Sequence, residues 1–136
     1  MNNLLDALSD KISSSTALYA DVAGRIFLDE APEGSQFPYI VISIISGVPE
    51  DTFTEKLDDI LIQFSLFSIS KSVTEIADMY ADLKTLFDGA MLTITGDTCI
   101  WCERTNLVTM VEEVTTKEGT ATVKHWAVDY AITVQD

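Results

Sequence analysis

The sequence is poor in cysteine, proline and histidine. It has two cysteines, three prolines and one histidine among 136 residues. Two cysteines cannot form the disulfide framework that stabilises small secreted domains. No apolar run approaches the ~18 residues that a transmembrane helix requires, and the N-terminus lacks the basic region of a secretory signal. We therefore expect a protein that is made and kept in a cytoplasm and does not enter a membrane.

Basic residues are also scarce. The chain has 22 acidic residues against 8 lysines and arginines, so its formal net charge is −14. Such a chain repels phosphate groups at long range, which argues against specific nucleic-acid binding and against an anionic membrane surface. Two interpretations stay open: an ordinary acidic soluble protein, or a surface that must lie near DNA without adhering to it.

The length fits one domain, residues 1–136. Helical spacing of leucines predicts a helix over residues 4–12, and a second short helix precedes Gly24, which can act as a C-terminal cap. Apolar, β-branched stretches predict the main strands. They cover Tyr39 to Ile45, Leu57 to Ile69, Cys99 to Val114 and Val123 to Val134.

One longer helix is predicted between the second and third of these strands. Ser72-Val73-Thr74-Glu75 has the pattern of a capping box, and an apolar stripe follows it at helical spacing. The stripe is Ile76, Tyr80, Leu83 and Phe87, with Asp78, Asp82 and Lys84 expected to face water. The whole order predicts an α+β fold: a mixed, largely antiparallel sheet with an N-terminal helical segment and one long amphipathic helix packed on one face.

Turn-forming residues and acids cluster in the middle of the chain. Residues 47–51, Gly-Val-Pro-Glu-Asp, are typical of a turn. The nearby acids lack the pattern of a calcium-binding loop. They are Glu50, Asp51, Glu55, Asp58 and Asp59. They fit a solvated loop, or a loop that becomes ordered against a neighbouring subunit.

No motif predicts an enzyme, a cofactor or a metal site. Cys99 and Cys102 have Cys-x-x-Cys spacing, but they lie in a predicted strand, where residues three apart point to opposite faces. We expect both to be buried structural residues. His125 and Asp129 are roughly 13 Å apart along a strand, which is too far for a catalytic pair.

The aromatic residues are expected to form the core, because basic residues do not alternate with them as in a platform for stacking nucleic-acid bases. This group includes Phe27, Phe37, Tyr39, Phe64, Tyr80, Trp126 and Tyr130.

Short motifs through much of the chain resemble one family. A helical N-terminus leads into Gly24-Arg25-Ile26-Phe27, an acidic proline-containing loop at residues 29–32, and Phe37-Pro38-Tyr39-Ile40-Val41. Ser46-Gly47-Val48-Pro49-Glu50 follows, and the helix from Ser72 to Phe87 comes after the central strand. This order is similar to the small tail-completion, or tail terminator, proteins of long-tailed phages and prophages.

The resemblance implies a structural role in the virion. Proteins of this kind cap the head-proximal end of the tail tube as a ring, usually of six copies, end tube polymerisation and join the tail to the head connector. The implied partners are other copies, the tail tube protein and the connector, while DNA passes through the lumen. Assembly would take place in the host cytoplasm. Contacts are expected at the loop around residues 48–56 and the turn near residue 117. The candidate interface residues are Arg25, Val48, Pro49, Glu50, Asp51, Thr52, Phe53, Glu55, Lys56, Lys117 and Glu118.

Three other functions remain open at this point. The acids could make the protein a DNA mimic that inhibits a DNA-binding enzyme. The cysteine pair could serve a small thiol enzyme. The chain could also be another connector or tail-tube component of similar size.

Overall fold

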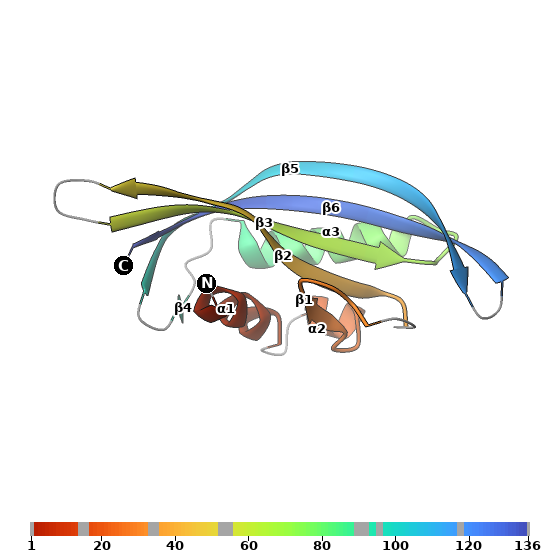
Figure 1. Ribbon diagram of the computed structural model, residues 1–136. Coiled ribbons are helices and arrows are strands. Elements are labelled where there is room, and N and C mark those ends of the chain that lie inside the picture. The colour runs from red at the N-terminus through yellow and green to blue at the C-terminus, as the bar shows by residue number, and fades with distance from the viewer. Residues whose placement is uncertain are drawn as a thin grey trace.

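A computed structural model describes residues 2–13, 17–32, 36–51, 56–88, 93–94, 97–116 and 119–135. It contains a curved sheet with helices on one side (Figure 1). The helices are α1 (Asn2–Ser13), α2 (Ala17–Asp21) and α3 (Thr74–Phe87). The strands are β1 (Ile26–Leu28), β2 (Tyr39–Asp51), β3 (Lys56–Ser68), β4 (Thr93–Ile94), β5 (Asp97–Thr116) and β6 (Gly119–Gln135). None of the described helices is long and apolar enough to cross a membrane.

The strands form one sheet in the order β1-β2-β3-β6-β5-β4. β1 and β2 run parallel, and every other neighbouring pair is antiparallel. The expected α+β class is therefore confirmed, including the mixed but largely antiparallel sheet. Figure 1 shows the β2–β3 hairpin reaching beyond one end of the body and the β5–β6 hairpin reaching beyond the other.

All three helices bury their apolar stripes against the same face of the sheet, here called the helix-side face. α1 contributes Leu4, Leu8 and Ile12, and α3 contributes residues of the predicted stripe. The alternate residues of β3 and β6 meet them, as the period of two requires. These strand residues are Ile60, Ile62, Phe64, Leu66, Val128, Tyr130, Ile132 and Val134.

The opposite face, here called the outer face, carries a separate row of large side chains. The register places Tyr39 beside Phe67, Phe67 beside His125, and His125 beside Met110. Phe27 and Phe37 also contact the Tyr39 ring. The expectation of one aromatic core is therefore wrong for this group. Successive strand residues alternate between faces, so the aromatic residues are divided between the two sides.

The start of α3 differs from the capping-box prediction. Its N-cap position is Val73, which makes no side-chain cap hydrogen bond. The Ser72 hydroxyl instead accepts a hydrogen bond from the Thr74 amide at 3.2 Å. The Glu75 carboxylate accepts one from the Ser68 hydroxyl at 2.7 Å. Ser68, a buried residue at the end of β3, thus binds the Glu75 carboxylate, which in a capping box would accept a hydrogen bond from the backbone amide of the N-cap residue.

Residues 47–51 form a strand rather than the predicted turn. β2 stays paired with β3 from Tyr39↔Phe67 to Asp51↔Lys56, with a bulge between Ile44 and Ser46. Proline is tolerated in a strand where its missing amide would point away from the ladder. β1 covers only Ile40–Ile42 on the other side of β2, so Pro49 lies in a stretch where that edge pairs with no described strand.

The end of α2 also uses an unexpected residue. The Gly24 amide donates to the Tyr19 carbonyl at 3.1 Å and the Ala23 amide donates to the Ala20 carbonyl at 3.2 Å. These two bonds define a Schellman cap. Ala23, with φ of 50°, occupies the left-handed position that glycine usually takes, while Gly24 lies one residue further on.

Candidate subunit and partner interface

Arg25 lies just before β1 and binds the segment that leads into β2. Its Nε donates to the Pro38 carbonyl at 2.9 Å, and its Nη2 donates to the Phe37 carbonyl at 3.2 Å. The Phe37–Pro38 peptide bond is cis. A backbone hydrogen bond adds to this contact, since the Ile40 amide donates to the Arg25 carbonyl at 3.0 Å. The guanidinium therefore supports the fold at this edge, and the expected place of Arg25 in an interface stays a prediction.

Five of the other candidate interface residues lie in the part of the chain that the structure describes. Val48 to Asp51 form the end of β2, and Lys56 begins β3. Thr52, Phe53 and Glu55 lie outside the described residues, as do Lys117 and Glu118. Figure 1 shows the Asp51 end of β2 at one extreme of the molecule and the Thr116 end of β5 at the other. These described candidates therefore lie at the end of the sheet opposite the Thr116 end of β5, and their role in contacts stays a prediction.

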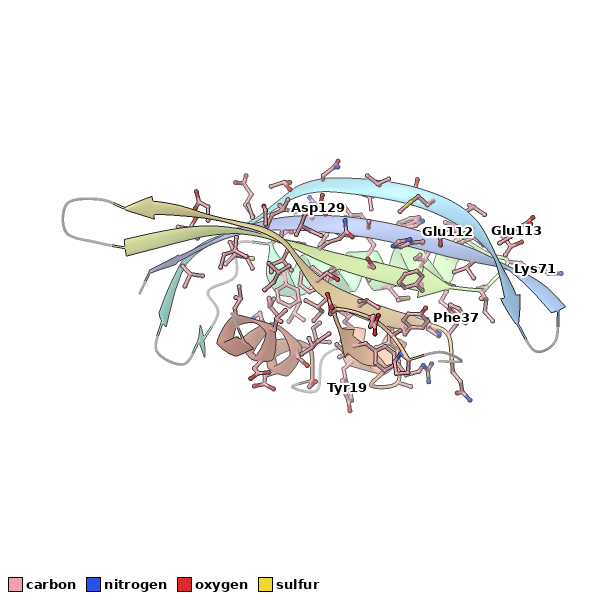
Figure 2. The ribbon with its side chains drawn as sticks, viewed as in Figure 1. Tyr19, Phe37, Lys71, Glu112, Glu113 and Asp129 are labelled. Carbon is pink, nitrogen blue, oxygen red and sulfur yellow. The ribbon has the colours of Figure 1, made fainter. Side chains whose placement is uncertain are left out.

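The outer face carries a continuous stack of rings near the Tyr39 end of β2. Tyr39 and Phe67 stack with centroids 4.8 Å apart, and Phe67 and His125 stack at 4.2 Å. Burial raises the pKa of Tyr39, and the negative charge of Glu112 raises it further. Figure 2 shows Phe37 and Glu112 at this same end of the sheet. The stack crosses β2, β3 and β6, so it holds these three strands in register on the face without helices.

The same face becomes polar toward the other end. The Gln63 amide donates to Asp129 at 3.1 Å, and the Thr133 hydroxyl donates to Asp59 at 2.8 Å. Asp59 was expected in a solvated loop or at a strand entrance, and it lies within the β3–β6 ladder. The outer face therefore changes from aromatic near Tyr39 to acidic and hydroxylic near Asp59.

A shallow pocket of about 300 Å³ lies where the segment after β1 passes over this face. Its floor comes from alternate residues of β2 and β3, and two acids lie in its rim segment. The lining residues are Asp29, Glu30, Ala31, Tyr39, Val41, Ser43, Ser65 and Phe67. The floor combines two aromatic rings and a valine with two serine hydroxyls, and the carboxylates beside it make the pocket unfavourable for an anion.

The histidine and cysteine residues occupy structural positions in the sheet. His125 Nδ1 lies 3.2 Å from Glu112 Oε1 on the neighbouring strand, whereas Asp129 bonds to Gln63. Cys102 is buried, as expected; the Cys99 side chain lies outside the described part. Cys99 stands opposite Val134 and Cys102 opposite Ile132, on either side of a register shift. The simple alternation assumed for residues three apart therefore does not apply to the backbone register here, because a bulge lies between them.

The carboxyl groups of Asp21, in α2, and Asp82, in α3, lie against each other. The sequence had predicted that Asp82 faces water. The pKa of Asp21 is raised to about 7, first by burial, then by a hydrogen bond to Asp82 and by the charges of Asp82, Asp78 and Glu75. Asp21 Oδ2 is buried without a hydrogen-bond partner among the described residues. Asp82 therefore lies at the contact between α2 and α3, where its hydrogen bond to Asp21 favours the protonated form of the Asp21 carboxyl.

A polar triad fastens the end of α3 to the sheet. The Tyr130 hydroxyl donates to Asp88 Oδ1 at 2.6 Å, and Arg104 Nη2 lies 3.5 Å from Asp88 Oδ2. Arg104 Nη1 also donates to the Tyr80 hydroxyl at 2.8 Å. Burial, followed by the hydrogen bond to Asp88, raises the pKa of Tyr130, so this phenol stays protonated and acts as a donor. The sequence shows no local sign of this contact because its members lie far apart in the chain.

Comparison with known proteins places this fold in a family. A search of curated protein sequences finds no match. Among solved structures, a chain from the virion of a native gene transfer agent particle superposes with a TM-score of 0.71. It is 13% identical, and the match covers 96% of this chain and 93% of that one. A second solved chain has a TM-score of 0.50 at 13% identity, covering 96% and 94%. These likenesses concern the fold.

The sequence itself matches a family model over residues 6–135, which is nearly its whole length. That model describes tail completion protein gp17, a family of structural proteins of phage tails. The resemblance inferred from the short motifs is thereby confirmed. The chain belongs to the tail completion protein gp17 family.

Proposed function

We propose that this protein caps the head-proximal end of a phage tail tube as a ring of identical copies, most simply six. In this position it ends polymerisation of the tube and presents a surface to the head connector. The observation that carries the proposal is the family match over residues 6–135. The fold shared with a chain of a virion particle supports a place within such a particle.

The shape of the molecule is suitable for that position. Hairpins extend from both ends of the sheet (Figure 1), so one end can contact the tube while the other contacts the connector. Residues 48–51 and Lys56 lie at one of these ends, and Thr116 and Gly119 mark the other. A role between two different neighbours requires two separate contact regions, and this arrangement supplies them.

The charge supports a further part of the proposal. Copies with a net charge of −14 each would surround the lumen with negative potential, which repels DNA within about a Debye length. DNA could then pass without adhering to the wall. A structure of the assembled ring with a neutral or basic lumen would contradict this part of the proposal alone.

The test is deletion of the gene from its parent phage, followed by negative-stain imaging of the particles. The expected result is tails of irregular, excessive length or heads and tails that are not joined, with recovery when the wild-type protein is supplied. Normal, joined and infectious particles after deletion would refute the proposal. Complete loss of tails would instead indicate a component of the tube.

A further inference from the structure

We propose that neighbouring copies in the ring join edge to edge, so that β5 of one copy extends the sheet of the next copy at its β1 and β2 edge. This inference rests on the proposed ring and names the contact that would build it. The occupant of the β5 edge is a second copy of this chain.

β5 offers a long unpaired edge. From Asn106 to Thr116 it pairs residue for residue with β6, and β4 covers only Asp97 and Thr98 on its other side. No other described strand pairs with that side. About half of the backbone amides and carbonyls of an edge strand point away from its single partner, and they form a template for another chain.

This edge carries two acids, Glu112 and Glu113, and its register shifts lie before Asn106, but it lacks the two residue types that block pairing most effectively. Natural edge strands are commonly blocked by lysine or proline, and β5 contains neither. Val108 is 44% exposed and Val111 is 70% exposed. Val108 stands opposite Ala127 on the outer face, while Val111 stands opposite Lys124 on the other face. Apolar, β-branched side chains are thus exposed on both faces of the same strand, as expected where a further strand would cover them.

The opposite edge of the same sheet provides the matching surface. β1 is the last strand on that side and covers only Ile40–Ile42 of β2. Ser43 to Val48 therefore has no described strand beyond it. Pro49 limits this edge, because proline has no amide to donate. One copy consequently carries both halves of a contact, and head-to-tail repetition of such a contact forms a ring when the rotation between neighbours closes.

The strand directions agree with this arrangement. β2 is antiparallel to β3, β3 to β6, and β6 to β5, so β5 and β2 run in opposite directions within one copy. A second copy that continues the sheet around a ring keeps the same orientation. Its β1 and β2 would then lie antiparallel to the β5 of the first copy, in the slightly more stable form of strand pairing.

Electrostatics favours a backbone contact over charge pairing. Each copy carries a net charge of −14, so the copies repel one another at long range. Backbone hydrogen bonds and buried valines do not depend on complementary charges. Raising the salt concentration should therefore strengthen the contact by screening the repulsion.

The test is site-specific photo-crosslinking in particles rescued in the deletion phage. Val108→p-benzoylphenylalanine places the reactive group on the β5 edge, and Ala81→p-benzoylphenylalanine on an exposed part of α3 is the control. The expected product is a covalent oligomer of this chain with links to Ile26–Leu28 or Ser43–Val48 of another copy, absent from the control. Links to β5 of another copy, links to a different protein, or no link in normal particles would overturn the inference.

Proline substitutions provide an independent test. In an antiparallel edge strand, adjacent amides alternate between pointing inward and pointing outward, so only one of Thr109→Pro and Met110→Pro removes an outward amide. The variant that loses an outward amide keeps all hydrogen bonds to β6, so its melting temperature should be unchanged, whereas the other variant loses a bond within the sheet and should melt at a lower temperature. Loss of one backbone hydrogen bond weakens the affinity of each contact roughly fivefold. Because every interface of the ring contains the substitution, every interface is weakened.

The outward proline variant should therefore yield at least fivefold fewer rescued particles. Ala17→Pro, at the first position of α2, where proline is well tolerated, should rescue as the wild type does. A folded β5 proline variant with full rescue would overturn the edge contact while leaving the capping function intact. Normal particles without the gene would instead refute the capping function.

Discussion

Removal of the Asp21 charge should stabilise the protein at neutral pH and above. The pKa of Asp21 is raised from 3.8 to about 7, first by burial and then by Asp82. Below pH 3.8 this group is protonated in both the folded and the unfolded chain. Between pH 3.8 and 7 the folded chain holds a proton that the unfolded chain has lost, so the free energy of unfolding falls as the pH rises.

The size of this effect follows from the two pKa values. The interval from 3.8 to about 7 corresponds to about 4 kcal/mol in the absence of solvent. The carboxyl is partly open to water, which screens the interaction, so we expect about 1–2 kcal/mol. Asp21→Asn keeps a neutral group of the same shape beside Asp82. It should therefore raise the free energy of unfolding by about 1–2 kcal/mol at pH 8 and leave it nearly unchanged below pH 4.

Urea unfolding of wild type and Asp21→Asn at a series of pH values measures this difference. Asp10→Asn, on the exposed side of α1, removes the same formal charge and should show no comparable dependence on pH. A gain of equal size at pH 4 and pH 8, or a loss at pH 8, would refute the reasoning, because neither result could come from the titration of Asp21.

Three further predictions concern the stability of the folded chain, measured by urea unfolding. Ala23→Gly should raise the free energy of unfolding by about 1 kcal/mol, because the alanine has φ of 50°; a loss would contradict the cap assignment. Arg25→Lys should lower it by about 1–2 kcal/mol, since one ammonium group cannot reproduce both bonds to the carbonyls of residues 37 and 38, and an unchanged value would show that these bonds contribute little. Phe64→Ala should cost about 3–5 kcal/mol, because the ring is fully buried against Phe87 and Tyr130; a cost near zero would mean that the core is packed differently.

Local patterns in the sequence predict the main elements well. The alternation from Trp126 to Val134 and the stripe from Ile76 to Phe87 both depend on a repeat that burial on one side imposes. The structure accordingly contains β6 and α3 in those places. The resemblance to tail-completion proteins is also visible in short motifs, which mark boundaries in this chain: Gly24 follows α2, and Pro38 precedes β2.

Contacts between distant residues explain what local patterns miss. Glu75 has the right spacing for a capping box, but it bonds to Ser68, which only the packing of α3 on the sheet brings near. The strand at residues 47–51 contains turn-forming residues, but pairing with β3 keeps it extended. A bulge between Cys99 and Trp101 shifts the register that a regular strand would have. In each case tertiary structure overrides a local preference.

The candidate interface residues are less predictable for a related reason. A contact surface is defined by which strands lie at the edges of the sheet, and the sequence alone does not order the strands. Val108 and Val111 appear in the sequence as ordinary strand residues. Their exposure points to a contact only once the strand order is known, because β6 lies on one side of β5 and β4 covers only Asp97 and Thr98 on the other.

Stability and assembly are therefore expected to depend on separate parts of the molecule. The free energy of folding comes mainly from the helix-side core, which includes Phe64 and Tyr130, whereas the proposed contact uses outward backbone groups of β5 that pair with no described strand of the same copy. A core variant should lower both the melting temperature and the yield of joined particles, because an unfolded copy cannot assemble. An edge variant should lower only the yield. The relation between these two measurements across a set of variants thus separates residues that act through folding from residues that act through the ring.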